Sequence, residues 1–529
     1  MSPAARAETV FVNGNFLTMD ADRSRVSALA VTGDRIVSVG AEAEALGEHP
    51  ATTIVDVQGR TVVPGLIDAH AHIELMTYSR NFFGDVRELG ADVILAQLGR
   101  QVAEAPAGTW IVLQGTFGQE FPALSQLDAV APDHPVAIRW SMHKYQLNSA
   151  AMRVSGISTR TVAPPGSRIQ RDSSGRPTGV LEEGWDLLAW EAPVSAVLAP
   201  LLEQTLREHF LANGVTTVNE IAASAAGVRA FRHLAGQRTI PRIGLALTCG
   251  PGHQALTTAE QLPALGIETG FGDDWCQIQG LKIFLDGGRD GALRSSGLSG
   301  PADGWGLLSR TPQTLAQEVT VAVEGGVQVW VHAIGDLAQE VAVSAVEQAV
   351  RANPGTPHRT RIEHLTNEMY APERLHRLLA AGGIAVPNPG LIVAEPSDPG
   401  NRLPPGVPKY ALRTLLDAGG MVPGNSDTSG AQPFTCNPWY VMGCMLTRQN
   451  KHGVVLDPAE ALTVDEALSS FTRDAAYATS QERSRGTLEP GKLADFVVID
   501  QDPYADGVDI ASTRALATVV GGHVLHGTI

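Results

Sequence analysis

The chain has 529 residues, of which 43% are hydrophobic and 18% charged, so it can bury a large core and global disorder is excluded. Lys and Arg total 39 against 56 Asp and Glu, and the net charge of −17 argues against a surface for nucleic acid or anionic membrane. The 4 cysteines include no CxxC pair and no apolar run is long enough to span a bilayer, so we expect a cytoplasmic protein without a disulfide framework or cysteine-rich zinc module.

The two ends of the chain resemble each other and differ from its middle. Short β-rich segments broken by Gly and Asn turns predict strands at 9–18, 35–40, 53–59, 494–500 and 518–525. Neither end alone offers a large sheet. We therefore expect residues 1–64 and 485–529 to combine into one small discontinuous β-sandwich domain.

The middle of the chain, residues 65–484, repeats apolar β-rich runs with helical patterns between them. Runs without alternation suit strands that are buried on both faces of a parallel sheet. The predicted strands are 61–68, 214–220, 242–248, 279–286, 327–332, 361–364, 383–387 and 421–427. Strands that alternate with helices in this way favour an α/β fold, a (β/α)8 TIM barrel, although a doubly wound sheet also fits the pattern.

The first barrel strand is followed by two closely spaced histidines, in the segment Asp68-Ala-His70-Ala-His72. A period of two places both imidazoles on the same side of the strand end. Paired imidazoles are ready ligands for a first-row metal ion. Two polar loop histidines without a metal are the alternative for this motif alone.

The interval between the first and second barrel strands is about 140 residues long, whereas a single crossover needs about a dozen. We therefore expect an inserted subdomain at about 76–200, after the first barrel strand. Its predicted position is over the mouth of the barrel.

The fourth predicted strand contains a lysine, Lys282, inside the apolar run Leu281-Lys-Ile-Phe-Leu. An isolated ammonium is costly to bury there, and an ion pair with Asp286 or another carboxylate is one explanation. The other is carboxylation by CO2, because desolvation favours the neutral amine that CO2 requires. The product would be an anionic carboxylate able to bridge two metal ions.

Three later strands end on residues that can bind metal: His332, His364 and Asp427. The carboxyl ends of barrel strands form one rim, where the active sites of this fold are built. We expect these residues to lie near His70 and His72. Together they predict a metal site at the rim.

With these residues in view, the chain resembles the amidohydrolase superfamily. The ligand set of that superfamily matches His70, His72, Lys282, His332, His364 and Asp427. The amidohydrolase-3 branch is matched by Gly280-Leu-Lys-Ile-Phe-Leu-Asp-Gly-Gly, Val331-His-Ala-Ile-Gly-Asp, Arg361-Ile-Glu-His-Leu and Gly486-Thr-Leu-Glu-Pro-Gly-Lys-Leu-Ala-Asp-Phe. The resemblance covers about residues 8–525 and implies one or two divalent ions per chain, Zn2+ first and other divalent metals second.

The resemblance also assigns three positions outside the ligand set. His143 matches the family's Asp-Gly-His segment only at the histidine, Glu183 matches a glutamate near the site, and Arg448 matches an arginine after the last barrel strand. It therefore implies contacts with substrate for His143, Glu183 and Arg448. Because the family segment is incomplete here, the identity of the substrate stays open.

The implied reaction is hydrolysis of a carbon–nitrogen bond in a small molecule, a non-peptide amide, formamide or cyclic amide. A divalent ion lowers the pKa of bound water from about 15.7 to near 7. Asp427 would act as general acid and base, and His143 would stabilise the oxyanion.

The alternatives are a deaminase, an esterase or a decarboxylase on the same fold, or a non-catalytic binding or regulatory barrel. We expect a small-molecule substrate and no nucleic-acid or membrane partner. A homodimer is compatible with the sequence, which does not fix the oligomeric state.

Overall fold

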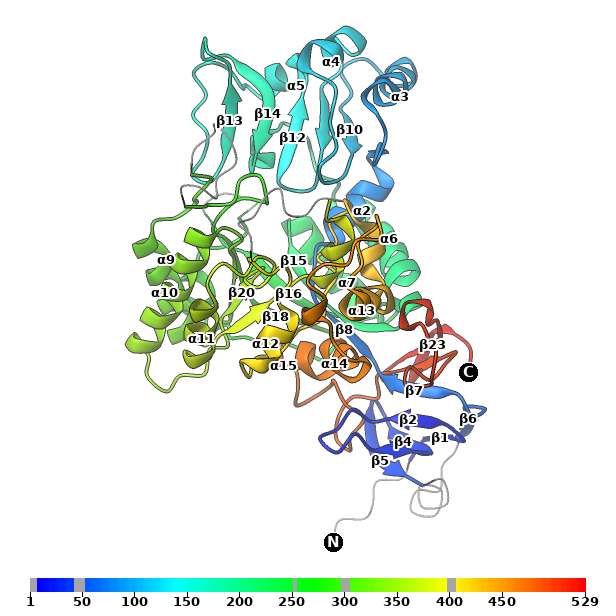
Figure 1. The fold of residues 1–529 in the computed structure, drawn as a ribbon. Helices are drawn as coiled ribbons and strands as arrows, with labels where there is room; N and C mark the ends of the chain where they lie inside the picture. Colours follow the sequence, from blue (N-terminus) through cyan, green and yellow to red (C-terminus); the bar gives the residue numbers. More distant parts are fainter. Residues whose placement is uncertain (1–6, 42–52, 251–254, 296–304, 397–405) are drawn as a thin grey trace.

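The computed structural model describes residues 7–41, 53–250, 255–295, 305–396 and 406–529. Figure 1 shows a sheet-containing subdomain at the top, a central α/β unit below it, and the sheets of the two chain ends near the labels N and C. Within the described residues, no helix has the length and apolar character needed to cross a membrane.

A curled parallel sheet forms the centre of the molecule. Its strands follow the order β21-β20-β19-β18-β16-β15-β8. Their bounds are β8 (Leu66–Ala71), β15 (Val215–Ala222), β16 (Arg242–Thr248), β18 (Cys276–Phe284), β19 (Val329–His332), β20 (Arg361–Glu363) and β21 (Ile384–Val386). Each strand lies parallel to the next one along the chain, and the short β17 (Phe271–Gly272) pairs antiparallel with β18. This one-directional order is that of a barrel, so the doubly wound alternative does not apply.

The predicted first strand, 61–68, is divided in the structure. Residues Thr61–Pro64 form β7, which pairs with strands of the chain ends, and only the remainder enters the central sheet as part of β8. The break lies at Gly65, where an added Cβ would stand 2.1 Å from Oγ1 of Thr216. The close approach of β15 therefore requires glycine at this point.

The predicted eighth strand, 421–427, forms no regular strand. Pro423 has no N–H, and the N–H of Ser426 donates to Oδ1 of Asp68 at 3.1 Å instead of to a neighbouring strand. The prediction of a regular strand is therefore wrong. The N–H of Gly424 donates to the carbonyl of Ser470 and that of Asp427 to the carbonyl of His70 in β8, so the pairing with one neighbour does not repeat along the segment.

The same segment nevertheless occupies the open edge of the central sheet. The N–H of Ala69 in β8 donates to the carbonyl of Gly424 at 3.0 Å. On the other side, Nδ2 of Asn425 donates to the carbonyl of Pro387, just after β21, at 2.7 Å. The segment thus joins the last strand of the sheet to the first and closes it.

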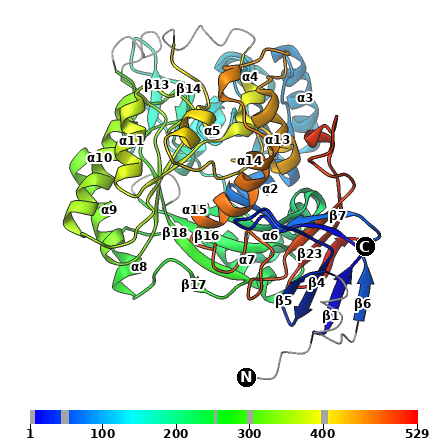
Figure 2. The same cartoon turned by 60° about the horizontal axis from the view of Figure 1, so that its bottom comes forward.

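Helices surround the central sheet, and α9, α10 and α11 lie together on one side of it (Figure 2). Their bounds are α2 (Ile73–Asn81), α6 (Ser195–Thr205), α7 (Ala225–Gln237), α8 (Gln261–Ala264), α9 (Pro312–Glu324), α10 (Asp336–Ala352), α11 (Pro372–Ala380), α12 (Leu412–Asp417), α13 (Pro438–Thr447), α14 (Val464–Ser469) and α15 (Ala475–Ala478). Local signals start several of them: Thr311 caps α9 by accepting from the N–H of Thr314, and Pro312 occupies the first turn.

The chain ends form two further sheets. One has the order β5-β4-β1-β6 and the other β24-β23-β22-β7-β2-β3. Their bounds are β1 (Thr9–Val12), β2 (Asn15–Leu17), β3 (Arg25–Val26), β4 (Ala28–Thr32), β5 (Arg35–Gly40), β6 (Thr53–Asp56), β22 (Phe496–Ile499), β23 (Ala515–Val520) and β24 (His523–Gly527). Phe11 and Phe496, from opposite ends of the chain, pack edge to face with ring centroids 4.9 Å apart in a core that both sheets share.

The subdomain between β8 and β15 has a six-stranded sheet in the order β13-β14-β12-β11-β10-β9. Its bounds are β9 (Gly84–Asp85), β10 (Ile111–Gln114), β11 (Val136–Arg139), β12 (Lys144–Leu147), β13 (Arg168–Arg171) and β14 (Pro177–Glu182), with α3 (Ala91–Glu104), α4 (Leu124–Val130) and α5 (Ser149–Val154). Leu98, Leu113, Leu127 and Ile138 belong to a core of its own. We call residues 84–182 the insert.

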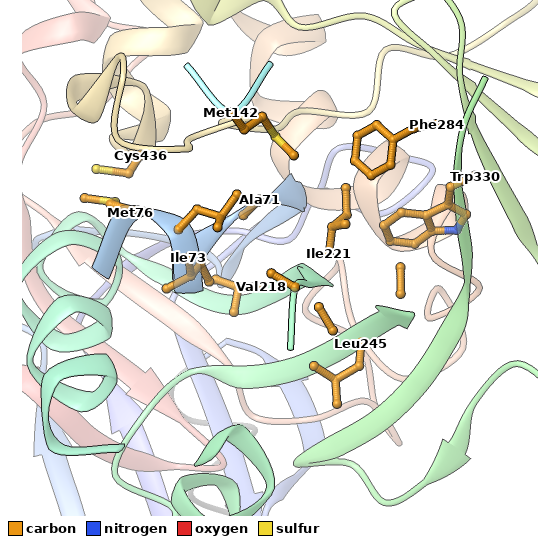
Figure 3. Packing of buried hydrophobic residues seen from close by; sticks show 14 of the residues in the cluster. Ala71, Ile73, Met76, Met142, Val218, Ile221, Leu245, Phe284, Trp330 and Cys436 are labelled. Carbon is orange, nitrogen blue, oxygen red and sulfur yellow. The ribbon is translucent and has the colours of Figure 1, made fainter. Parts of the chain in front are cut away.

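The main core lies directly beneath the ends of the barrel strands. Figure 3 shows Val218, Ile221 and Leu245 of β15 and β16 in this cluster, with Phe284 and Trp330 beside them. Trp330 is fully buried, and its Nε1 donates to Oε1 of Gln328 at 2.9 Å. This packing fixes the rim from which the functional side chains project.

Candidate metal centre and the cavity above it

Three of the predicted ligands converge at the end of β8. Nε2 of His70 and Nε2 of His72 are 3.4 Å apart, and Oδ1 of Asp427 lies 3.4 Å from the first and 3.5 Å from the second. Ligands of a tetrahedral Zn2+ with bonds of about 2.0–2.1 Å stand about 3.3–3.4 Å from one another. The three donor atoms therefore have the spacing that one metal ion requires.

A buried carboxylate orients His70. Nδ1 of His70 lies 2.5 Å from Oε2 of Glu363, so Nε2 is left for the centre. Glu363 is itself held by Arg361, whose Nε and Nη2 donate to its two oxygens at 2.8 and 2.9 Å. Sequence reasoning missed Glu363. The sequence feature that could have indicated Glu363 is its i, i+2 spacing from Arg361, because this spacing places an ion pair on one face of β20.

His332 and His364 lie next to this group. Their ring centroids are 4.5 Å apart, and the ring of His364 lies 5.8 Å from that of His70. Nδ1 of His364 lies 2.5 Å from Oδ1 of Asn388, while Nε2 of His332 is 3.2 Å from the carbonyl of Gly287. Within the described residues, the set that meets ligand spacing contains only His70, His72 and Asp427.

Lys282 is fully buried beside His70. Its Nζ lies 3.4 Å from Nε2 of His70 and 4.9 Å from the centroid of the Phe284 ring. The ion pair with Asp286 is not formed, because the Asp286 carboxylate accepts from the N–H groups of Leu293, Ile334 and Gly335. Burial lowers the pKa of Lys282 to about 8.

The protonation states suit metal binding. Burial lowers the pKa of His70 to about 3 and those of His72 and His364 to about 4, so these imidazoles are neutral near pH 7. Burial alone would raise the pKa of Asp427, but the surrounding imidazoles outweigh it and hold this pKa well below its usual range. Neutral imidazoles and an ionised carboxylate are the forms that coordinate metal.

Several site residues have a left-handed backbone. The φ angles are 73° at His364, 46° at Asp427 and 50° at Glu183. Such conformations are costly for residues other than glycine and persist where surrounding contacts enforce them, often at functional sites.

A histidine of the insert pairs with a carboxylate that directly follows the insert in the chain. Nδ1 of His143 lies 2.9 Å from Oε1 of Glu183, and the same oxygen accepts from the N–H of Gly288 at 2.8 Å. A Cβ at Gly288 would stand 2.7 Å from Cγ of His143, so only glycine allows this contact. The loop after β18 thereby fixes the pair over the rim.

A cavity of about 360 Å³ lies between the insert and the rim. The predicted site residues that line it are His143, Glu183, His332, His364 and Asp427. Its other lining includes Phe117, Trp140, Lys144, Arg289, Glu368, Leu391, Tyr410 and Lys451.

Arg448 lies outside this lining. It is fully buried, and its guanidinium donates to the carbonyls of Lys409, Tyr410 and Leu456 at 2.7, 3.0 and 3.1 Å. These contacts hold the segment that carries Tyr410, so the structure places Arg448 behind the cavity wall. Sequence reasoning could not find these partners, because they are backbone carbonyls of other loops.

Comparison with known proteins agrees with this architecture. The chain is 28% identical to Protein LONG AFTER FAR-RED 3 of Arabidopsis thaliana, over 98% of this chain and 92% of that protein. It is also 28% identical to the N-substituted formamide deformylase of Arthrobacter pascens, over 97% of each. The fold resembles that of an uncharacterized metal-dependent hydrolase from Pyrococcus horikoshii, with a TM-score of 0.72 at 22% identity over 95% of this chain and 99% of that one.

A family model described as "Amidohydrolase family" matches residues 53–526. That range holds the metal donors, the insert and the cavity. The chain therefore belongs to the amidohydrolase family.

Proposed function

We propose that the protein is a metal-dependent hydrolase that cleaves a carbon–nitrogen bond in a non-peptide amide, formamide or cyclic amide. The observation that carries the proposal is the spacing of 3.4–3.5 Å among the donor atoms of His70, His72 and Asp427, with Asp427 facing a cavity of small-molecule size.

The donor set fits a divalent ion, and Zn2+ is the first candidate. His70, His72 and Asp427 would hold it, and Glu363 would keep His70 in the required tautomer. A bound divalent ion supplies Lewis acidity, which favours ionisation of water and polarises a carbonyl group. His332 and His364 would serve a second ion.

A second ion would need an anionic bridge, and we propose Lys282 as its source. The buried ammonium has no carboxylate within salt-bridge distance among the described residues. Carboxylation would form an N–C bond between Nζ and CO2, and the amine would lose a proton to solvent. The product would be a carboxylate beside His70.

Asp427 is the best placed proton carrier. Its Oδ1 lies among the imidazoles, and no hydrogen bond to Oδ2 is found in the part of the chain that the structure describes. Its side chain is 16% exposed and lines the cavity. It can accept a proton from attacking water and deliver it to the departing amine nitrogen.

We propose that His143 donates a hydrogen bond to the substrate. Nδ1 of His143 contacts both oxygens of Glu183 and the residue lines the cavity, where it would meet the oxygen that gains charge when the carbonyl is attacked. Burial alone would lower the pKa of His143, but the Glu183 carboxylate outweighs burial and raises it. The raised pKa favours the protonated, donating form.

The test combines metal analysis with turnover. The purified, metal-loaded protein is assayed on N-formyl amines, N-acyl amino acids and cyclic amides. Matched esters and amino-purines test for esterase and deaminase activity. We expect about one or two equivalents of metal and turnover of at least one amide class. Bound metal without turnover of any amide would contradict the proposal and favour a binding or regulatory barrel.

A further inference from the structure

One wall of the cavity carries charges that the proposed hydrolysis does not use. They are Arg289 and Arg294 after β18, Glu368 after β20, and Glu395 and Lys409 further along the chain. We call these residues the wall cluster. Arg289 and Glu368 line the cavity directly, together with Asp427.

The wall cluster has more cations than carboxylates. Nζ of Lys409 donates to Oε2 of Glu395 at 2.5 Å, and Nη2 of Arg289 donates to the other oxygen of the same carboxylate. Arg294 donates to Oε2 of Glu368 at 3.0 Å. Three cations therefore share two carboxylates, which leaves one positive charge uncompensated within the cluster.

Carboxylates outside the cluster also line the cavity, so this count describes the cluster and not the whole lining. Asp290, the next residue after Arg289, accepts from Nζ of Lys144 at 3.1 Å. Oε1 of Glu368 lies 4.0 Å from Nε of Arg289, which makes a second and longer ion pair with the same guanidinium.

Arg289 is the member of the cluster that can meet a ligand. Its side chain is 31% exposed, against 11% for Arg294 and 7% for Lys409. One nitrogen, Nη2, is fixed by Glu395 and lies 3.5 Å from the hydroxyl of Tyr410. Among the described residues no hydrogen bond is found for its Nε or Nη1. Nε and Nη1 point to different sides of the guanidinium, so a carboxylate would accept from one of them, paired with the second N–H of Nη2 where a fork forms.

We propose that Arg289 binds an anionic group of the substrate, so that the preferred substrates are acylated amines that carry a carboxylate. A carboxylate would give the exposed N–H donors of Arg289 a charged acceptor, whereas a neutral ligand would cover them without one. The substrate class rests on the proposed hydrolase function, whereas the anion site itself does not need turnover.

Binding of matched probes tests the anion site independently of activity. Hippurate and hippuramide share one skeleton and differ only in carboxylate against carboxamide. Their dissociation constants are measured by titration calorimetry on the metal-loaded protein. We expect hippurate to bind at least about tenfold more tightly, and Arg289→Gln to reduce this ratio at least about tenfold, as loss of a charge-assisted hydrogen-bond pair predicts.

Two further variants keep the test decisive. Lys451→Gln removes another cavity cation, whose Nζ contacts Oε1 of Glu88 at 2.6 Å, and should change the ratio less than about threefold. Arg289→Lys keeps the positive charge but not the paired N–H donors, so its ratio of the two dissociation constants should lie between those of the wild type and Arg289→Gln. This variant also provides the test if Arg289→Gln folds poorly.

The outcomes separate the two proposals. Equal binding of both probes by the wild type would overturn the anion site. A hippurate preference that survives Arg289→Gln would overturn it too, because the carboxylate would then bind the metal. Selective binding of hippurate without turnover of any amide would instead support the anion site and contradict the proposed hydrolase function.

Discussion

The floor and the wall of the cavity are built on different parts of the fold. The floor is lined by Asp427, which contacts His70 and His72 at the end of β8. The side chains of these two histidines are only 0 and 3% exposed, and a packed core lies beneath them. The wall consists of loop and insert residues such as His143 and Arg289, which are 18 and 31% exposed. In the proposed function, rigid strand ends would carry the metal chemistry, whereas adjustable loops would select the substrate.

Replacement of both His70 and His72 should have the largest effect on metal content and turnover. The double substitution His70→Ala and His72→Ala deletes two of the three donors, so we expect loss of most bound metal and at least about a 10³-fold loss of turnover. Elemental analysis and the amide assay measure both. The control is His233→Ala with His376→Ala, two exposed histidines on α7 and α11, which should keep full metal. Unchanged metal in the first variant would disprove the assigned site.

The next effect separates proton transfer from metal holding. Asp427→Asn keeps the shape and one donor oxygen but cannot accept a proton, so turnover should fall about 10²–10⁴-fold while most metal stays bound. Asp290→Asn, which changes a cavity-lining carboxylate paired with Lys144, is the matched control. If Asp427→Asn turns over at nearly the wild-type rate with a full metal load, then Asp427 is not the proton carrier.

A substitution in the wall should reduce turnover less than one in the floor, and its effect should depend on pH. Glu183→Gln removes the carboxylate that raises the pKa of His143, and we expect turnover to fall about 10–100-fold. A protonated donor is active below its pKa, so activity declines as pH rises through that pKa. Loss of Glu183 lowers the pKa and should therefore move the alkaline limb of the profile to lower pH. An alkaline limb that stays in place would show that His143 does not act through this proton.

The last substitution tests whether Glu363, which contacts His70, contributes to metal affinity. Glu363→Gln leaves all three donors in place but weakens the hold on His70, so metal affinity should fall about 10–100-fold. Competition with a chelator measures the affinity, and thermal unfolding checks that Arg361 without its partner leaves the fold intact. An affinity equal to that of the wild type would show that Glu363 is not needed to orient His70.

The same contrast explains what could be predicted from the sequence. The floor residues follow apolar runs, and a period of two with a common rim is enough to bring His70, His72 and Asp427 together. The length of the interval after β8 likewise led to the expectation of a subdomain at about 76–200. These signals are local or follow from the topology of a parallel sheet.

Other features depend on contacts between distant segments. The predicted first strand is divided at Gly65 because Thr216 lies too close for a side chain at that position. The segment after Pro423 is irregular because the N–H of Ser426 donates to the side chain of Asp68. Arg448 was assigned to the substrate, yet its partners are carbonyls that no pattern marks. The wall cluster, too, is assembled from separate loops, so its excess charge is visible only once the loops are placed.

Anomalous diffraction from crystals of the metal-loaded protein tests the central claim most directly. Data collected at the absorption edge of the bound metal should show a peak about 2.0–2.2 Å from Nε2 of His70, Nε2 of His72 and an oxygen of Asp427. A peak elsewhere on the molecule, or none at these donors in a protein that retains its metal, would contradict the account.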